Sequence, residues 1–282
     1  MAYNKLHKKD FTIAVKHGSD LGAVKFKKEA TKGELFFDTF DKKLYIASTD
    51  AGSTDAILYN TDAFTLTPAP FSNNYSLELD GADDYATLGT TYSALSGNKS
   101  ISGWFYFDSV STRSIFAPVG AGSFSAQGWF ILNASSIRFR AGSTLHTFTV
   151  PSLSTGTWYH LAVTGDGTDL KLYINGTQQG GDKADGDWSI GEFFRTSTYY
   201  YFDGKVDEIG LWTGTTLTSS EVQSIANISG ASGNKAIDLS TYTGLTHWWR
   251  FGDGGDTTTV SDKVGTNDMS LAQTANFIGD TP

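Results

Sequence analysis

The chain has 282 residues, no cysteine and a formal net charge of −9 at neutral pH. The lack of cysteine excludes a disulfide framework, a thiolate metal site and a cysteine nucleophile. Because 31 glycines, 19 phenylalanines, 13 tyrosines and 7 tryptophans favour short strands and tight turns, we predict an all-β protein.

The charge is distributed unevenly along the chain. Residues 1–33 hold eight lysines against three acidic residues, a net +5, which leaves −14 of the total for the remaining residues. A basic arm of this kind suits docking on an acidic partner, or is a solvated lysine-rich terminus, whereas the acidic body would repel nucleic acid. No apolar run is long enough to span a membrane, and residues 1–11 lack the apolar core of a signal peptide. We therefore expect neither nucleic-acid binding nor membrane insertion.

Residues 1–65 are predicted to form a small basic β-module around GELFFDTFDKKLYIAS, residues 33–48. Two short strands, residues 34–37 and 43–47, flank a polar turn. The pattern resembles a β-module of phage tail-fibre and other virion appendage proteins. The resemblance implies anchoring to virion proteins through residues 1–65 and a homo-oligomer, with a trimer favoured. The alternative is an ordinary hairpin that packs on the main domain of a monomer.

Two prolines and two asparagines in LTPAPFSNN, residues 66–74, break both the helical and the strand periodicity and predict a linker. The following domain, residues 75–282, contains many short strand candidates separated by Gly, Ser and Asp, which is typical of a β-sandwich that includes a C-terminal strand near Trp248 and Trp249. One helix is predicted over residues 219–226, because Thr218 can cap it and Glu221 completes a capping box.

The hairpin signature in this domain is TWYHLAVTGDGTDLKLYINGT, residues 157–177, in which two alternating runs flank Gly165-Asp166-Gly167. This stretch resembles LamG-like members of the concanavalin A-like jelly rolls. The similarity continues in three further motifs in the family's order: YSLELDGADDYATL at 75–88, ISGWFYFD at 101–108 and FDGKVDEIGLWTGTTLTSSEVQSI at 202–225. The resemblance implies a jelly-roll sandwich of a class that mostly binds rather than catalyses.

Carboxylates gather in the first and last parts of that region. The first and last strands of such sandwiches lie close together, and calcium favours sites rich in oxygen ligands. Related domains often hold a structural or ligand-bridging Ca²⁺, so the resemblance makes Asp80, Asp83 and Asp207 candidate ligands. The alternative is that Asp80 and its neighbours only shape a turn.

For binding, aromatic rings in polar surroundings are the useful residues, because flat rings stack on sugar faces while polar groups orient hydroxyls. The candidate contacts are Trp188, Tyr199, Tyr200 and Tyr201, with Arg195 as a hydrogen-bond donor. The competing interpretation is that some of these rings fill the sandwich edge or a subunit interface.

No catalytic residues are predicted. Glucanases of this fold carry a Glu-x-Asp-x-x-Glu strand, whereas residues 78–83 end in Asp and contain a glycine turn. We therefore expect a non-enzymatic phage virion surface or appendage protein, made in the host cytoplasm, that adheres to host-surface glycans. The alternatives are a purely structural capsid decoration or cement protein, a secreted bacterial carbohydrate-binding module and, last, a glycoside hydrolase.

Overall fold

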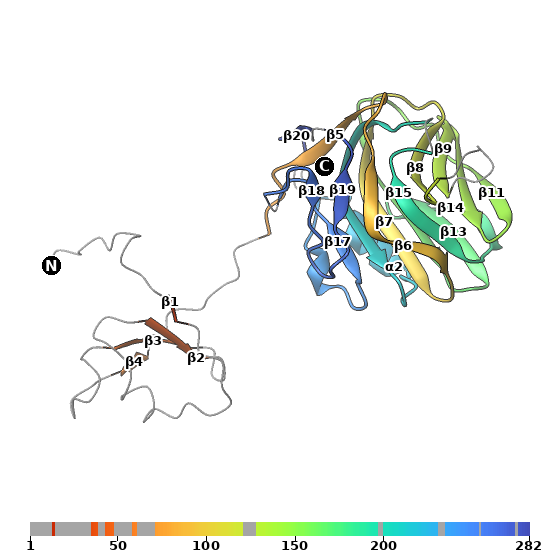
Figure 1. The fold of residues 1–282 in the computed structure, drawn as a ribbon. Coiled ribbons are helices and arrows are strands. Elements are labelled where there is room, and N and C mark those ends of the chain that lie inside the picture. Colours follow the sequence, from red (N-terminus) through yellow and green to blue (C-terminus); the bar gives the residue numbers. More distant parts are fainter. Residues whose placement is uncertain are drawn as a thin grey trace. The chain divides into compact units, whose positions relative to one another are not determined.

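The computed structural model describes residues 71–120, 128–196, 200–230, 235–253, 255–273 and 276–282, together with the backbone of four short strands before residue 71 (Figure 1). The chain divides into two compact units, Met1–Pro70 and Phe71–Pro282. Among the described residues, no helix has the length and apolar character that crossing a membrane requires.

The described part of the first unit is a small sheet. Its strands are β1 (Ile13–Ala14), β2 (Leu35–Asp38), β3 (Lys43–Ala47) and β4 (Leu58–Asn60), in the order β1-β2-β3-β4. Strands β2 and β3 pair antiparallel, with Leu35 opposite Ile46, and form the hairpin that the sequence predicts. The lysine-rich arm, apart from the two residues of β1, lies outside the described residues.

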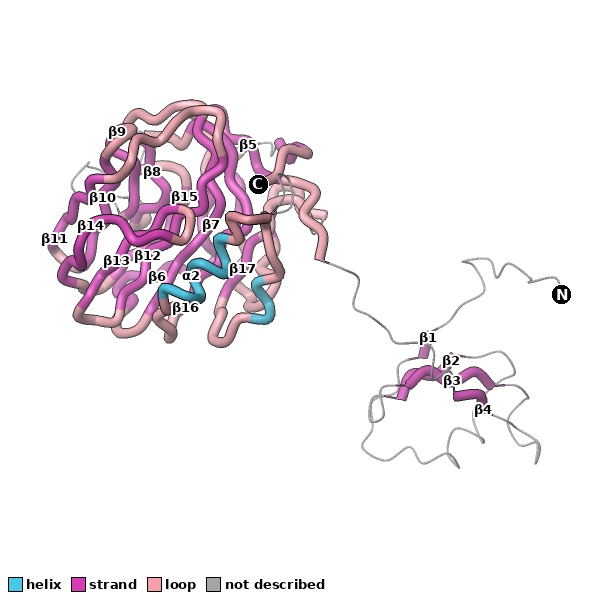
Figure 2. Tube along the Cα trace, turned by 180° about the vertical axis from the view of Figure 1, so that it is seen from behind, coloured by secondary structure: helices cyan, strands magenta, loops and turns pink. Residues whose placement is uncertain are grey.

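The second unit is a sandwich of two sheets (Figures 1 and 2). The first sheet has the order β11-β10-β9-β8-β15-β6-β19-β18. Its strands are β6 (Ala86–Leu95), β8 (Arg113–Ala117), β9 (Trp129–Asn133), β10 (Ser136–Ala141), β11 (Thr144–Thr149), β15 (Trp188–Phe193), β18 (Thr259–Val260) and β19 (Met269–Leu271).

The second sheet has the order β14-β13-β12-β7-β16-β5-β20, and β17 also pairs with β16. Its strands are β5 (Ser76–Asp80), β7 (Lys99–Phe107), β12 (Trp158–Gly165), β13 (Asp169–Ile174), β14 (Thr177–Ala184), β16 (Asp203–Trp212), β17 (His247–Trp249) and β20 (Asn276–Ile278). Within the sandwich, the described strand pairs are antiparallel. The predicted all-β jelly roll is therefore confirmed.

The main core lies between the two sheets. In β7, Ile101 and Phe105 point into it, whereas Ser102 and Trp104 point to the opposite face, because successive side chains of a strand alternate. The same alternation in β12 buries Leu161 and Val163 in the core. It leaves His160, Ala162 and Thr164 on the far side of the second sheet, which we call the outer face.

The outer face is partly covered by α2 (Ser219–Ala226), whose bounds are those that the sequence predicts (Figure 2). The Thr218 side chain accepts a hydrogen bond from the Glu221 backbone N–H, and the Glu221 carboxylate accepts one from the Thr218 N–H, so the capping box is formed. Val222 and Ile225 bury against a second hydrophobic cluster on this face, which includes Tyr173. A short 3-10 helix, η2 (Leu239–Thr241), adds Leu239 to it.

The linker predicted over residues 66–74 ends earlier in the structure, because residues 71–74 contact the sandwich. Phe71 stacks on Trp248 with ring centroids 6.2 Å apart. Asn73 donates from Nδ2 to Asp207 Oδ2 at 2.7 Å, and the Asn74 N–H donates to Asp253. The second unit accordingly begins at Phe71.

Candidate functional site

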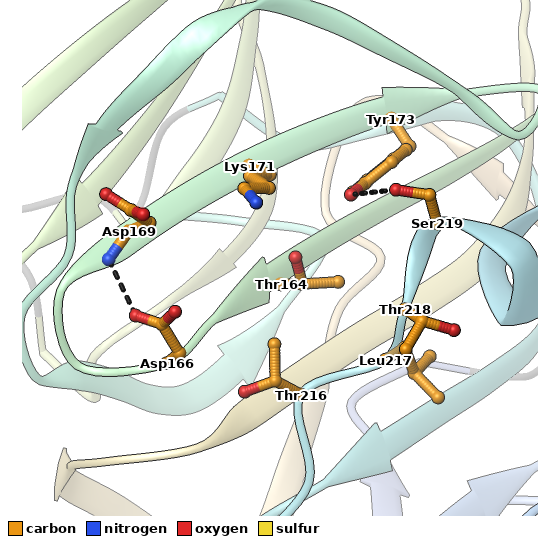
Figure 3. Close-up of a pocket in the computed structure, with 9 residues that line it drawn as sticks. All are labelled: Thr164, Asp166, Asp169, Lys171, Tyr173, Thr216, Leu217, Thr218 and Ser219. Atoms are coloured by element: carbon orange, nitrogen blue, oxygen red, sulfur yellow. Dashed lines mark hydrogen bonds between the residues drawn. The ribbon is translucent and has the colours of Figure 1, made fainter.

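A polar pocket of about 160 Å³ lies on the outer face, at the turn between β12 and β13 (Figure 3). One wall comes from this hairpin and the other from the segment that leads into α2. The lining residues are Thr164, Asp166, Asp169, Lys171, Tyr173, Thr216, Leu217, Thr218 and Ser219. Five of the nine carry a hydroxyl, two a carboxylate and one an ammonium group, so the pocket suits a ligand that forms many hydrogen bonds.

The hairpin wall is shaped by the Asp-Gly turn. Asp166 Oδ1 accepts hydrogen bonds from the backbone N–H groups of Thr168 at 2.8 Å and Asp169 at 2.7 Å, and Gly167 adopts a φ of +90° that few other residues tolerate. These hydrogen bonds, first that of Asp169 and then that of Thr168, lower the pKa of Asp166. Asp166 is therefore ionised at neutral pH.

Strand β13 supplies the rest of this wall through its alternation. Leu170 and Leu172 point into the sandwich core, so Asp169, Lys171 and Tyr173 point to the outer face. The Lys171 ammonium lies 3.6 Å from a carboxylate oxygen of Asp182, and both side chains are partly exposed. The positive charge of Lys171 is therefore shared with a carboxylate outside the pocket.

The second wall is bonded to the first. Thr216 Oγ1 donates to the Gly165 carbonyl at 2.7 Å. The Tyr173 hydroxyl lies 3.2 Å from Ser219 Oγ, and Figure 3 draws this hydrogen bond. Leu217 is buried in the cluster under α2. These contacts hold the two walls together, so the pocket is built into the folded sandwich.

Trp188, predicted as a sugar contact, is fully buried, and that prediction is wrong. Its indole N–H donates to Asp185 Oδ1 at 3.0 Å, and its ring packs edge-on against Phe139 with centroids 4.8 Å apart. The Lys99 ammonium lies 4.9 Å from the Trp188 ring centroid and 2.6 Å from Asp185 Oδ2. The polar surroundings of Trp188 in the sequence are thus an internal ion pair rather than a solvated loop.

Arg195, predicted as a hydrogen-bond donor to a sugar, forms contacts within the protein. Its Nε and Nη2 donate to the two carboxylate oxygens of Glu192 at 3.2 and 3.1 Å, and its guanidinium carbon lies 3.1 Å from the Tyr85 ring centroid. Two of its donors are therefore engaged within the protein, and its role as a hydrogen-bond donor to a ligand stays a prediction.

Of the three predicted tyrosine contacts, the two that the structure describes lie outside the pocket lining. Tyr200 and Tyr201 are half-buried, and the carbonyl of Tyr200 accepts a hydrogen bond from the Ser114 N–H at 2.8 Å. Tyr199 lies outside the described residues. Neither Tyr200 nor Tyr201 lines the pocket, and the role of all three tyrosines as sugar contacts stays a prediction.

The predicted calcium ligands separate into two places. Asp80, Asp83 and Asp84 have carboxylate oxygens within 4.8 Å of one another. They are largely exposed, and Asp80 Oδ1 accepts hydrogen bonds from the N–H groups of Ala82 and Asp83. Burial raises the pKa of Asp84, which accepts a hydrogen bond from the Asp80 N–H. These contacts shape the turn after β5.

Asp207 is not part of that group. It lies four residues along β16 from Asp203, the register partner of Asp80, a separation of roughly 13 Å at about 3.3 Å per residue. The expectation that Asp80, Asp83 and Asp207 converge on one ion is therefore wrong, because four residues of β16 separate the third carboxylate from the strand position that pairs with Asp80.

Asp207 is fully buried, and its Oδ1 has no hydrogen-bond partner among the described residues; the same holds for Asn73 Oδ1. Burial, followed by the charge of Glu208, raises the pKa of Asp207 well above its usual value. Burial also raises the pKa of Glu208 to about 7, although Arg250 Nε donates to it at 3.0 Å. Two buried oxygens without donors, one of them on a carboxylate, fit the oxygen ligands that Ca²⁺ prefers.

A tyrosine, a histidine and an aspartate outside the pocket form a chain of hydrogen bonds that the sequence did not indicate. The Tyr92 hydroxyl lies 2.6 Å from His247 Nε2, and His247 Nδ1 lies 2.5 Å from Asp262 Oδ2. Asp262 also accepts from the backbone N–H groups of Trp248 and Asn267. The chain joins β6 to β17 and to the segment after β18, which is a structural role.

The residues of the pocket were missed in the sequence, although the hairpin that carries five of them was identified. The signal was the outward half of the alternation in β13, where Asp169, Lys171 and Tyr173 follow one another at every second position. What the sequence lacked was the opposite wall, because residues 216–219 lie more than 40 positions further along the chain.

Residues 80–223 match the profile of the concanavalin A-like lectin/glucanases superfamily in its laminin G type 3 family. No curated protein matches the sequence. A protein of Bacteroides ovatus that is proposed to bind carbohydrate has a similar structure, with a TM-score of 0.54 and 14% identity over 89% of this chain and 70% of that one.

Two further similar structures are more distant. The heptameric SAP-like pentraxin of Limulus polyphemus has a TM-score of 0.46 and 13% identity over 57% of this chain and 86% of its own. Domains LG4-5 of the mouse laminin α1 chain have a TM-score of 0.39 and 14% identity over 64% and 50% of the two chains. Because the family profile covers half of the sequence and the sandwich has the matching architecture, this chain belongs to the laminin G type 3 family of the concanavalin A-like lectin/glucanases superfamily.

Proposed function

We propose that this protein is a non-catalytic, glycan-binding adhesion protein. The observation that carries the proposal is the pocket on the outer face of the second sheet, which hydroxyl, carboxylate and ammonium groups line together. Sugars present several hydroxyls in a fixed geometry, and a preformed site with several hydrogen-bonding groups recognises them at a small entropic cost.

Binding fits this pocket better than turnover does. Glycoside hydrolysis needs a carboxylic acid with a raised pKa and a second carboxylate across the scissile bond. Asp166 has a lowered pKa, and Asp166 and Asp169 belong to the same turn instead of facing each other across a cleft. The carboxyls with raised pKa values that lie deepest, Asp207 and Glu208, are buried and line no part of the pocket.

We further propose that the sandwich is displayed on a phage virion, as a surface or appendage protein. The support is the resemblance of residues 33–48 to appendage modules, together with the hairpin of β2 and β3. In this proposal residues 1–65 bind virion proteins and bring the chains together as a trimer. Light scattering of the full chain tests the subunit count, and a monomer would contradict the trimer.

A structural Ca²⁺ is part of the same proposal, held by Asp207 and Asn73 rather than by the exposed group at Asp80. The support is the pair of buried oxygens that lack donors. Such an ion would balance a buried carboxylate and join residues 71–74, where the second unit begins, to β16.

A glycan array probed with the full chain tests the adhesion function. The pocket variant is Asp169→Ala combined with Lys171→Ala, and the matched control is Asp187→Ala, which removes an exposed carboxylate outside the pocket. Selective binding that the control retains and the pocket variant loses is the expected result. A stable oligomer that binds no glycan would favour a structural decoration protein of the virion instead.

A further inference from the structure

We infer that the pocket takes one terminal sugar residue of a glycan and that this residue carries no acidic group; the inference rests on the proposed glycan-binding function. Three properties of the pocket support it: its size, the sign of its charge and the hydrogen-bonding groups that remain free in it.

The size limits the ligand to about one ring. Pockets that enclose drug-sized molecules have volumes of about 300–1,000 Å³, whereas this one has about 160 Å³. It has two opposite walls, the β12–β13 turn and the start of α2, which are bonded to each other through Thr216 and Gly165. A small pocket whose two walls are bonded to each other suits the end of a glycan better than an internal residue, because an internal residue needs room for the glycan to continue on both sides.

The charge of the pocket disfavours acidic sugars. Asp166 and Asp169 face one ammonium group, that of Lys171, which already lies 3.6 Å from Asp182. The surrounding sandwich is acidic as well, since residues 71–282 hold 21 acidic and 11 basic residues. A carboxylate on the sugar would therefore meet like charge both on approach and in the pocket.

The helix terminus in the second wall does not reverse this preference. The N-terminus of a helix attracts anions through its free N–H groups and its dipole. Here the Glu221 carboxylate accepts hydrogen bonds from the Thr218 N–H and from Thr218 Oγ1, both at 2.8 Å. The protein's own carboxylate thus occupies the place that an acidic ligand would take.

The carboxylate of Asp169 is the free acceptor that would select hydroxyls. Its backbone N–H donates to Asp166, as Figure 3 shows, but no described residue donates to its side chain. A carboxylate has two oxygens and accepts hydrogen bonds from two neighbouring hydroxyls, or from an ammonium group. Lys171 lies two residues further along β13 on the same face, so its ammonium group can donate to a third oxygen of the sugar ring. The geometry matches a neutral or amino sugar.

The test uses calorimetric titration of the full chain with three oligosaccharides. They share the core of a neutral glycan that bound on the array and differ only in the terminal residue, which is a neutral hexose, an amino hexose or a uronic acid. We expect the neutral and amino ends to bind and the uronic end to bind at least about tenfold more weakly, which corresponds to about 1.4 kcal/mol. Asp169→Asn should lower the affinity for the neutral-ended ligand by about tenfold. It should also reduce the ratio between the affinities for the neutral-ended and the uronic-ended ligand. Asp187→Asn, the matched control, should change neither.

Two results would overturn the inference while leaving glycan binding intact. One is binding of the uronic-ended ligand as tightly as the neutral one. The other is an Asp169→Asn variant that binds like Asp187→Asn, which would put the sugar elsewhere on the sandwich. If none of the three ligands and no glycan on the array binds, the adhesion function and the inference both fall. The unfolding temperature of each variant shows whether a lost affinity reflects a lost fold.

Discussion

The Lys99 ammonium lies 2.6 Å from Asp185 Oδ2, and both side chains are completely buried. Asp185 also accepts hydrogen bonds from the Trp188 indole and from the Gly167 N–H at 2.9 Å. One buried carboxylate thus connects β7, the β12–β13 turn beside the pocket and the start of β15. A buried ion pair whose remaining lone pairs are satisfied is costly to break, because the partner left behind stays desolvated.

Trp188→Ala should lower the free energy of unfolding by about 3–5 kcal/mol, since a large buried ring leaves a cavity and the Asp185 carboxylate loses a donor. Chemical denaturation measures the change. Trp158→Ala, at a half-buried tryptophan of the outer face, is the control and should cost clearly less. An unchanged stability with a selective loss of glycan binding would show that Trp188 faces a ligand after all.

Thr218→Ala should destabilise the protein by about 1 kcal/mol, because it removes the side-chain acceptor of the Glu221 N–H at the start of α2. Thr218→Ser keeps the hydroxyl and should retain most of the stability. Since Thr218 also lines the pocket, a thermal melt should be compared with glycan titration at a temperature at which both variants are folded. Equal stability of the two variants would contradict the capping role.

Stability should depend on pH through His160. Burial lowers the pKa of His160 to about 3, from an ordinary value of 6.5, and neither ring nitrogen has a hydrogen-bond partner among the described residues. Between these two values the unfolded chain binds a proton that the folded protein does not. The stabilising contribution of neutral His160 to the free energy of unfolding is therefore fully present above pH 6.5 and is lost as the pH falls toward 3.

The wild-type profile alone does not isolate His160, because Glu208, whose pKa is raised to about 7, acts in the opposite direction over an overlapping range. The measurement is therefore the difference in unfolding free energy between wild type and His160→Gln. It should decrease by an amount on the order of 1.4 kcal/mol per pH unit as the pH falls from 6 to 4. A difference that does not change with pH would show that His160 is solvated or hydrogen-bonded.

Calcium should raise the unfolding temperature of the wild type if Asp207 and Asn73 hold an ion, since a ligand that binds only the folded state stabilises it. Asp207→Asn should abolish the shift, whereas Asp83→Asn, in the exposed group, should leave it unchanged. Differential scanning fluorimetry with calcium and with chelator measures both. A shift that Asp83→Asn removes would assign the ion to the turn after β5.

Local patterns were sufficient for the elements that local contacts stabilise. The capping residues Thr218 and Glu221 lie three positions apart, and the Asp166 turn is closed by hydrogen bonds within four residues. The bounds of α2 and the hairpin of β12 and β13 could therefore be predicted, and with them the jelly-roll class.

Only the tertiary structure decided which polar residues are accessible. The aspartates around Trp188 in the sequence predicted a surface loop. Inside the protein, however, Asp185 faces Lys99, a residue 86 positions earlier in the chain. Asp207 is separated from the partner of Asp80 by four residues of β16. The pocket needs the start of α2 beside a hairpin that ends more than 40 positions earlier in the chain. Periodicity along one segment determined the strands and the helix of this protein. The burial of a charge and the convergence of a site depended on pairing between segments that no local pattern encodes.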